Sequence, residues 1–161
     1  MTEQNQTDHV ECPATKDPAV RLFIVAAMCL GFGVWCAIDA YVADKYPYAA
    51  MDDDINQFMG WAFNHFAPVI LVPIGLVAAV WAIVFLRRVL VADEEGIGYK
   101  GKPKVAWSDI TDLDVSDLPD KKILRINHSA SGKPLVLDAW KLQNFREMVA
   151  FIEDHTPEEV Q

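Results

Sequence analysis

The side chains capable of metal or cofactor chemistry are thinly spread along this 161-residue chain. His9 and Cys12 are three residues apart and both bind zinc in other proteins, but two ligands are too few for a zinc site. His65 could serve as an axial ligand for a haem or chlorophyll-like pigment, yet nothing supplies a second ligand or a defined pocket. We expect neither metal nor cofactor, and we interpret His65 as a polar anchor at a membrane surface.

Catalytic side chains are present in the C-terminal half, but they do not form a recognisable motif. They fall in predicted turns and at strand ends, and they are Ser108, Ser116, His128, Ser129 and Ser131. The sequence contains no P-loop, no glycine-rich dinucleotide motif and no zinc spacing. We therefore expect no enzymatic activity. An unrecognised activity is the weaker alternative, because catalytic groups assemble in space rather than in sequence.

A cluster of basic residues offers a different chemistry, contact with anionic lipid. Arg87 and Arg88 precede Lys100, Lys102 and Lys104, which alternate around a predicted turn. Near an anionic leaflet each basic group contributes about 1 kcal/mol of attraction. The alternative is that these charges only set membrane orientation, since residues 93–95 are acidic. The formal net charge of -9 argues against nucleic-acid binding, which needs a cationic face.

Two long apolar blocks without a charged residue must position these groups. Residues 22–38 and 66–86 reach roughly 25 and 31 Å as helices, close to the hydrocarbon thickness of a bilayer. They predict transmembrane helices over 20–43 and 66–87. The segment before the first block is acidic rather than basic, and no cleavage site with a clear mature start appears, so we do not expect a secretory signal. We interpret the polar residues 1–19 as a mobile tail.

Small residues recur at four-residue spacing within both spans, which lets helix backbones approach closely in lipid. The pairs are Ala27 with Gly31, Gly33 with Ala37, and Gly75 with Ala79. Two spans joined by a short loop pack against each other in any case. The open question is whether small-residue faces that are not used in this packing bind other subunits. Pro73 removes a helical hydrogen bond and predicts a kink in the second span.

The connecting loop carries only Lys45, whereas more lysine and arginine residues lie before the first span and after the second. This distribution predicts a protein of the inner (plasma) membrane with both termini in the cytoplasm. The loop 44–65 then faces outside. It contains apolar residues at helical spacing after Asp52, which predicts a short amphipathic helix lying on the membrane. Asp39 lies near this outer interface, where a carboxylate is less costly than at mid-bilayer, and we interpret it as interfacial rather than as an ion site.

After the second span the pattern changes to short β-prone runs. We expect strands over residues 89–92, 97–99, 105–107, 110–115, 121–127 and 134–137. A helix over 140–154, capped by Asp138, follows, and residues 157–161 form a tail. The chain is thus predicted to be an α+β membrane protein, a two-helix hairpin followed by a small antiparallel sheet or partly open barrel with a C-terminal helix.

Residues 88–156 resemble the bacterial pleckstrin-homology-like domains that are often fused to paired membrane helices. The resemblance is carried by the D-E-E-G-I turn at 93–97, the W-S-D-I segment at 107–110 and the terminal helix. Pleckstrin-homology folds have seven strands, whereas this stretch has room for about six. The resemblance implies an interaction or oligomerisation module. We therefore expect a non-catalytic accessory or scaffold subunit that binds membrane lipids and other membrane subunits or itself, with an anionic-lipid sensor as the alternative.

Overall fold

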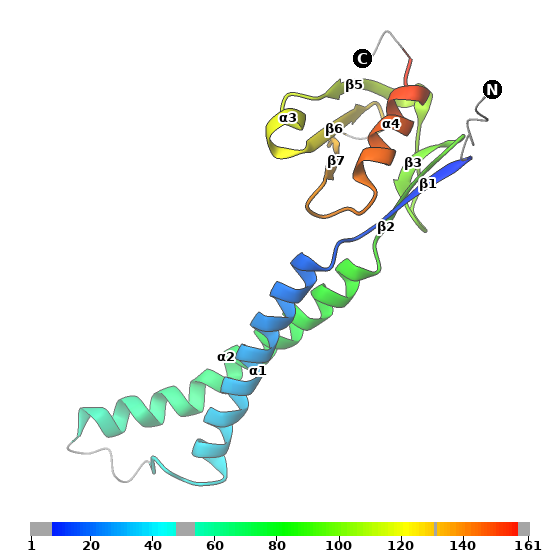
Figure 1. The fold of residues 1–161 in the computed structure, drawn as a ribbon. Helices are drawn as coiled ribbons and strands as arrows, with labels where there is room; N and C mark the ends of the chain where they lie inside the picture. Colours follow the sequence, from blue (N-terminus) through cyan, green and yellow to red (C-terminus); the bar gives the residue numbers. More distant parts are fainter. Residues whose placement is uncertain (1–7, 48–53, 131, 158–161) are drawn as a thin grey trace. The chain divides into compact units, whose positions relative to one another are not determined.

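The structure, a computed structural model, describes residues 8–47, 54–130 and 132–157 (Figure 1). The chain divides into two compact units. One is the helical hairpin, residues 18–84, and the other combines the residues up to Asp17 with those from Phe85 onward. The predicted α+β order is confirmed, since two long apolar helices are followed by antiparallel sheets and a C-terminal helix.

The hairpin consists of α1, Asp17–Tyr41, and α2, Ile55–Leu86. Both helices are long and apolar enough to cross a membrane. Their large apolar side chains point mostly outward, and Met28 and Val69 are 68% and 66% exposed. Water would penalise such a surface and lipid would not, because apolar area gains free energy when it leaves water. These features fit two membrane spans.

The start of α2 differs from the prediction. The separate amphipathic helix expected before the second span is instead the first part of α2, which runs without a break for 32 residues. At 1.5 Å per residue α2 is about 48 Å long, more than a hydrocarbon core of about 30 Å. It contains Pro68 as well as Pro73, and Figure 1 shows that it bends along its length. Asp52, the expected start of the amphipathic helix, lies outside the described residues.

The other unit contains two antiparallel sheets. The first has the order β1-β2-β3-β4, with β1 at His9–Pro13, β2 at Val89–Asp93, β3 at Gly96–Tyr99 and β4 at Val105–Ala106. The second has the order β5-β6-β7, with β5 at Ile110–Asp114, β6 at Ile123–His128 and β7 at Leu135–Asp138. Each of the six predicted regions contains a strand, with bounds that differ from the prediction by one or two residues. The largest difference is at β6, which begins at Ile123 rather than at Lys121, because Lys121 belongs to a helix.

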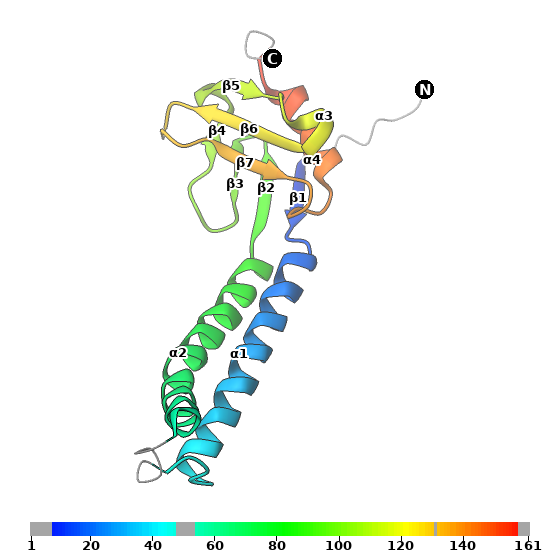
Figure 2. The same ribbon diagram turned by 90° about the vertical axis from the view of Figure 1, so that its left-hand side faces the viewer.

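Strand β1 contradicts the interpretation of residues 1–19 as a mobile tail. It pairs antiparallel with β2, from Pro13 opposite Val89 to His9 opposite Asp93. Its side chains alternate, because Val10 and Cys12 are buried while His9 is exposed. The whole helical hairpin is thus inserted between two neighbouring strands of one sheet (Figure 2).

The predicted turn at residues 93–97 is present and depends on a glycine. Gly96 has φ of +149°, which side chains with a Cβ rarely adopt. A Cβ at this position would lie 2.0 Å from the carbonyl oxygen of Val105 on β4, so the close approach of β3 and β4 requires glycine. The indole Nε1 of Trp107 donates to the Asp93 carbonyl oxygen at 2.8 Å. This bond connects the turn to the segment that follows β4.

The C-terminal helix α4 is shorter than predicted and runs over Phe145–His155. Asp138 does not cap it. The Asp138 carboxylate instead accepts from the Trp140 backbone N–H at 2.9 Å in a turn. Residues 140–143 are held by the linker between β1 and α1, because Thr15 N–H donates to the Lys141 carbonyl and Gln143 N–H to the Pro13 carbonyl, both at 2.9 Å. These bonds keep the expected first turn out of the helix.

A single apolar core joins both sheets and α4. Its fully buried side chains come from β1, β2, β3, β6, β7 and α4, and they are Cys12, Leu90, Ala92, Ile97, Ile126, Leu137, Met148 and Ile152. Phe145 is buried and Trp107 is partly buried against this core. A short helix that the sequence pattern did not predict, α3 at Leu118–Lys121, connects β5 to β6.

Candidate functional site

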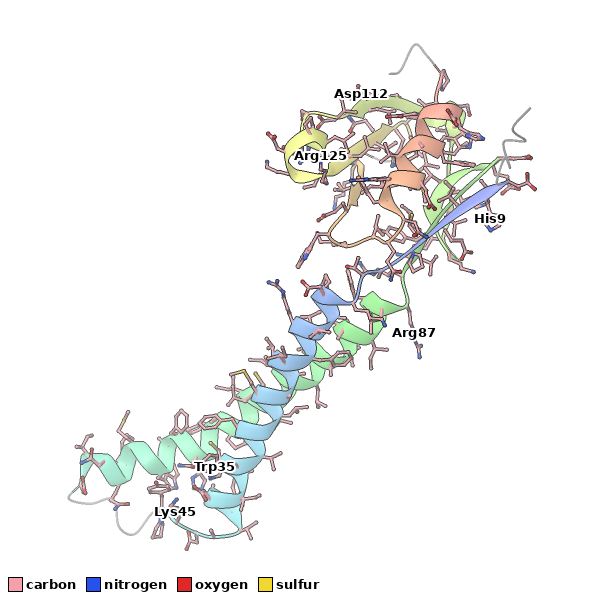
Figure 3. The ribbon with its side chains drawn as sticks, in the orientation of Figure 1. His9, Trp35, Lys45, Arg87, Asp112 and Arg125 are labelled. Atoms are coloured by element: carbon pink, nitrogen blue, oxygen red, sulfur yellow. The ribbon has the colours of Figure 1, made fainter. Side chains whose placement is uncertain are left out.

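The two zinc-capable residues near the N-terminus do not form a site. His9 and Cys12 lie on opposite faces of β1, because Cys12 is in the core and His9 is exposed. Figure 3 shows His9 on β1. Burial raises the pKa of the Cys12 thiol to about 11, so it stays protonated at neutral pH. Among the described residues no three His, Cys, Asp or Glu side chains gather as metal ligands.

The polar residues of the hairpin are engaged locally. The Nδ1 atom of His65 lies 2.9 Å from the Trp61 carbonyl oxygen one turn earlier, and the His65 ring packs at 4.8 Å from the Trp61 ring and 5.1 Å from the Tyr41 ring. Asp39 forms an ion pair with Lys45 at 3.3 Å, next to the loop that follows α1. This pairing offsets part of the charge of the Asp39 carboxylate.

The five candidate lipid-contact residues are not equivalent. Lys100 pairs with Glu11 of β1 at 3.1 Å, and Lys104 pairs with Asp93 and with Glu95. The hydrogen bond from Lys104 lowers the pKa of Asp93, so this carboxylate is charged and neutralises the lysine. Arg87, Arg88 and Lys102 have no ion-pair partner among the described residues, and Figure 3 shows Arg87 just beyond α2. Carboxylates therefore neutralise two of the five candidate side chains, Lys100 and Lys104.

The glycines of the spans separate into two kinds. A Cβ at Gly33 would lie 3.0 Å from Val72, and one at Gly75 would lie 2.7 Å from Leu30, so both glycines lie where α1 meets α2. A Cβ at Gly31 would meet nothing within 4 Å. Ala27, one turn earlier, is also exposed. Ala37 and Ala79 are half-buried. The Ala27 and Gly31 pair is thus a small-residue face that the hairpin itself does not use.

A second uncovered surface lies beside α4 and was not predicted from the sequence. It is a groove of about 650 Å³ between α3, α4 and the residue after β7. Its apolar lining includes Leu118, Ala139 and Val149. Its charged lining residues are Lys122, Arg146, Glu147 and Glu153. The sequence pattern predicted α4 but not α3, so it could not predict a groove between them.

No family model, curated protein or solved structure matches the chain.

Proposed function

We propose that the chain is a non-catalytic, membrane-anchored accessory or scaffold subunit of a membrane protein complex. Its partners are other integral membrane subunits or further copies of itself, and it resides in the bacterial inner membrane with both termini in the cytoplasm. The observation that carries this proposal is the uncovered small-residue face of α1 at Ala27 and Gly31. Such faces allow the close helix contact on which association in lipid depends.

The pairing of β1 with β2 supports the proposed topology. The two strands flank the hairpin, so they can pair only when both ends of the hairpin are in the same compartment. Two spans satisfy this condition, and the basic residues around the hairpin ends favour the cytoplasm.

The strand count supports the pleckstrin-homology-like assignment of the soluble unit. Strand β1 supplies the seventh strand that residues 88–156 lack, giving sheets of four and three strands with a C-terminal helix within the described residues. In this proposal the domain presents the groove beside α4 and its sheet edges to protein partners, because such surfaces accept helices and extended segments.

The test compares two substitutions in the full chain, purified in mild detergent. Gly31→Leu fills the uncovered face, whereas Val80→Leu adds bulk at an exposed position of α2 that carries no small-residue pair. Native mass measurement should give an assembly larger than the 18.0 kDa chain for the wild type and Val80→Leu. We expect Gly31→Leu to lose that assembly while its helices stay intact, because leucine has a higher helix propensity than glycine. An unchanged assembly in Gly31→Leu would refute the proposal.

A further inference from the structure

The turn between β7 and α4 carries a tryptophan whose ring is poorly covered. Trp140 is 47% exposed, although burial of its large apolar ring would gain more free energy than that of almost any other side chain. An indole combines an apolar body with one N–H group, and tryptophan is enriched where a membrane meets water. The position of Trp140 relative to the membrane spans therefore decides what covers its ring.

Hydrogen bonds fix Trp140 beside the first residue of α1. Its indole Nε1 donates to the Asp17 carboxylate at 3.2 Å. Its carbonyl oxygen accepts from the Thr15 hydroxyl, and the carbonyl of the next residue, Lys141, accepts from the Thr15 N–H at 2.9 Å. All four residues belong to the same compact unit. The ring therefore cannot move away from the start of α1 without breaking these bonds.

The first residue of α1 lies among the lipid headgroups when α1 crosses a bilayer. The charge-free block of this helix begins at Leu22, five residues after Asp17. Five residues of an α-helix measure about 7.5 Å along its axis. The headgroup layer on each side of the hydrocarbon core is about 5 to 8 Å thick. Asp17, and with it the ring of Trp140, is therefore at the depth of the headgroups.

Exposed lysines flank the ring on both of the segments that meet there. Lys16 precedes Asp17, and Lys141 follows Trp140 and stays 51% exposed beside Asp138. Ammonium groups bind phosphate oxygens, which phospholipid headgroups present at this depth. We propose that Trp140 is an interfacial anchor whose ring inserts among phospholipid headgroups and holds the turn before α4 against the bilayer. This inference rests on membrane insertion of the hairpin, and it is independent of the scaffold function.

The experiment places the photoreactive residue 4-benzoylphenylalanine at one position at a time in the full chain, in phosphatidylcholine vesicles. Irradiation joins it to a C–H group in contact, so a mass increase of one phosphatidylcholine identifies a lipid contact. Trp81, 62% exposed on α2, is the membrane control. Val115, 50% exposed, is the matched surface control, because it lies with Asp154 near the far end of α4. We expect the lipid adduct at positions 140 and 81 and its loss at position 115.

The three positions distinguish the ways in which the inference can fail. A lipid adduct at position 81 without one at 140 overturns the interfacial anchor alone, and a cross-link between two chains at 140 shows that a second copy covers the ring. An equally strong adduct at 115 removes the specificity for the turn, and no adduct at 81 refutes membrane insertion itself.

A second measurement keeps the native ring. The tryptophan emission that the wild type shows in excess of Trp140→Phe comes from Trp140, and brominated phosphatidylcholine should abolish this excess by contact quenching. Its persistence would overturn the proposal.

Discussion

Removing the helical hairpin should leave a folded soluble domain, provided that β1 is kept. We consider a chain in which residues 15–87 are replaced by Asn-Gly, so that Ala14 and Arg88 are joined by a tight turn. The Ala14 N–H already donates to the Arg88 carbonyl oxygen at 3.0 Å, and β1 and β2 are antiparallel neighbours. Asn-Gly favours the two-residue turn that connects such strands. The control is a second chain that begins at Arg88 and therefore lacks β1.

The expected loss of unfolding free energy follows from the apolar area and the hydrogen bonds that β1 contributes. Burial of Val10, Cys12 and Ala14 is worth about 4 kcal/mol in total, at about 0.8 kcal/mol per buried methylene and 1.5 to 3 kcal/mol for a valine. The five-residue pairing of β1 with β2, and the hydrogen bonds that Gln143 and Asn144 donate to β1 and Ala14, add roughly 1 kcal/mol for each hydrogen bond. A domain of this size has a total stability of about 5 to 13 kcal/mol. Loss of β1 therefore removes most or all of it.

Circular dichroism and urea unfolding provide the assay. We expect the chain with β1 to show a mixed sheet and helix spectrum and a cooperative unfolding transition, and the chain without β1 to show neither. Equal stability of the two chains would refute the assignment of β1 to the core. Failure of both chains to fold, in spite of correct expression, would refute the independence of the soluble unit.

Three further outcomes are expected. Gly96→Ala should destabilise the soluble domain by several kcal/mol, the combined effect of a clash with a backbone oxygen and an unfavourable φ, seen as a lower urea midpoint. Since Lys104 lowers the pKa of Asp93, this pair stabilises the domain above about pH 4, the ordinary pKa of aspartate, and the contribution is lost as the pH falls further. Lys104→Gln should therefore flatten the acid dependence of the unfolding midpoint, and an unchanged slope would contradict the pairing. In whole cells, a cysteine at Ala43 should react with an impermeant reagent and one at Ala130 only with a permeant one, the reverse pattern being incompatible with cytoplasmic termini.

Local sequence patterns were sufficient for elements whose partners are close in the chain. The two apolar spans and the strands from Val89 onward follow from hydropathy and alternation, because each pairs with its sequence neighbour or needs only lipid. Strand β1 was missed although Val10 and Cys12 alternate with polar residues. Five residues with a terminal proline are a weak signal, and the strand that pairs with them lies beyond both spans.

The candidate sites were predicted less well for the same reason. The acidic residues 93–95 already indicated an offset to the basic cluster, and Lys104 does pair with Asp93 and Glu95. The partner of Lys100, Glu11, was not predicted because it lies on the unexpected strand β1. The small-residue spacing located the glycines of both spans, but it did not distinguish Gly31 from the glycines that pack within the hairpin.

The insertion of the hairpin between β1 and β2 also constrains the order of events during biosynthesis. β1 leaves the ribosome first and must wait while about 75 further residues are made before β2 begins. At 5 to 20 residues per second this delay is roughly 4 to 15 seconds. A chain that has inserted only one helix would hold the two strands on opposite sides of the bilayer, and its sheet could not close. In the proposed membrane topology, pairing of β1 with β2 would therefore require that both helices have been inserted.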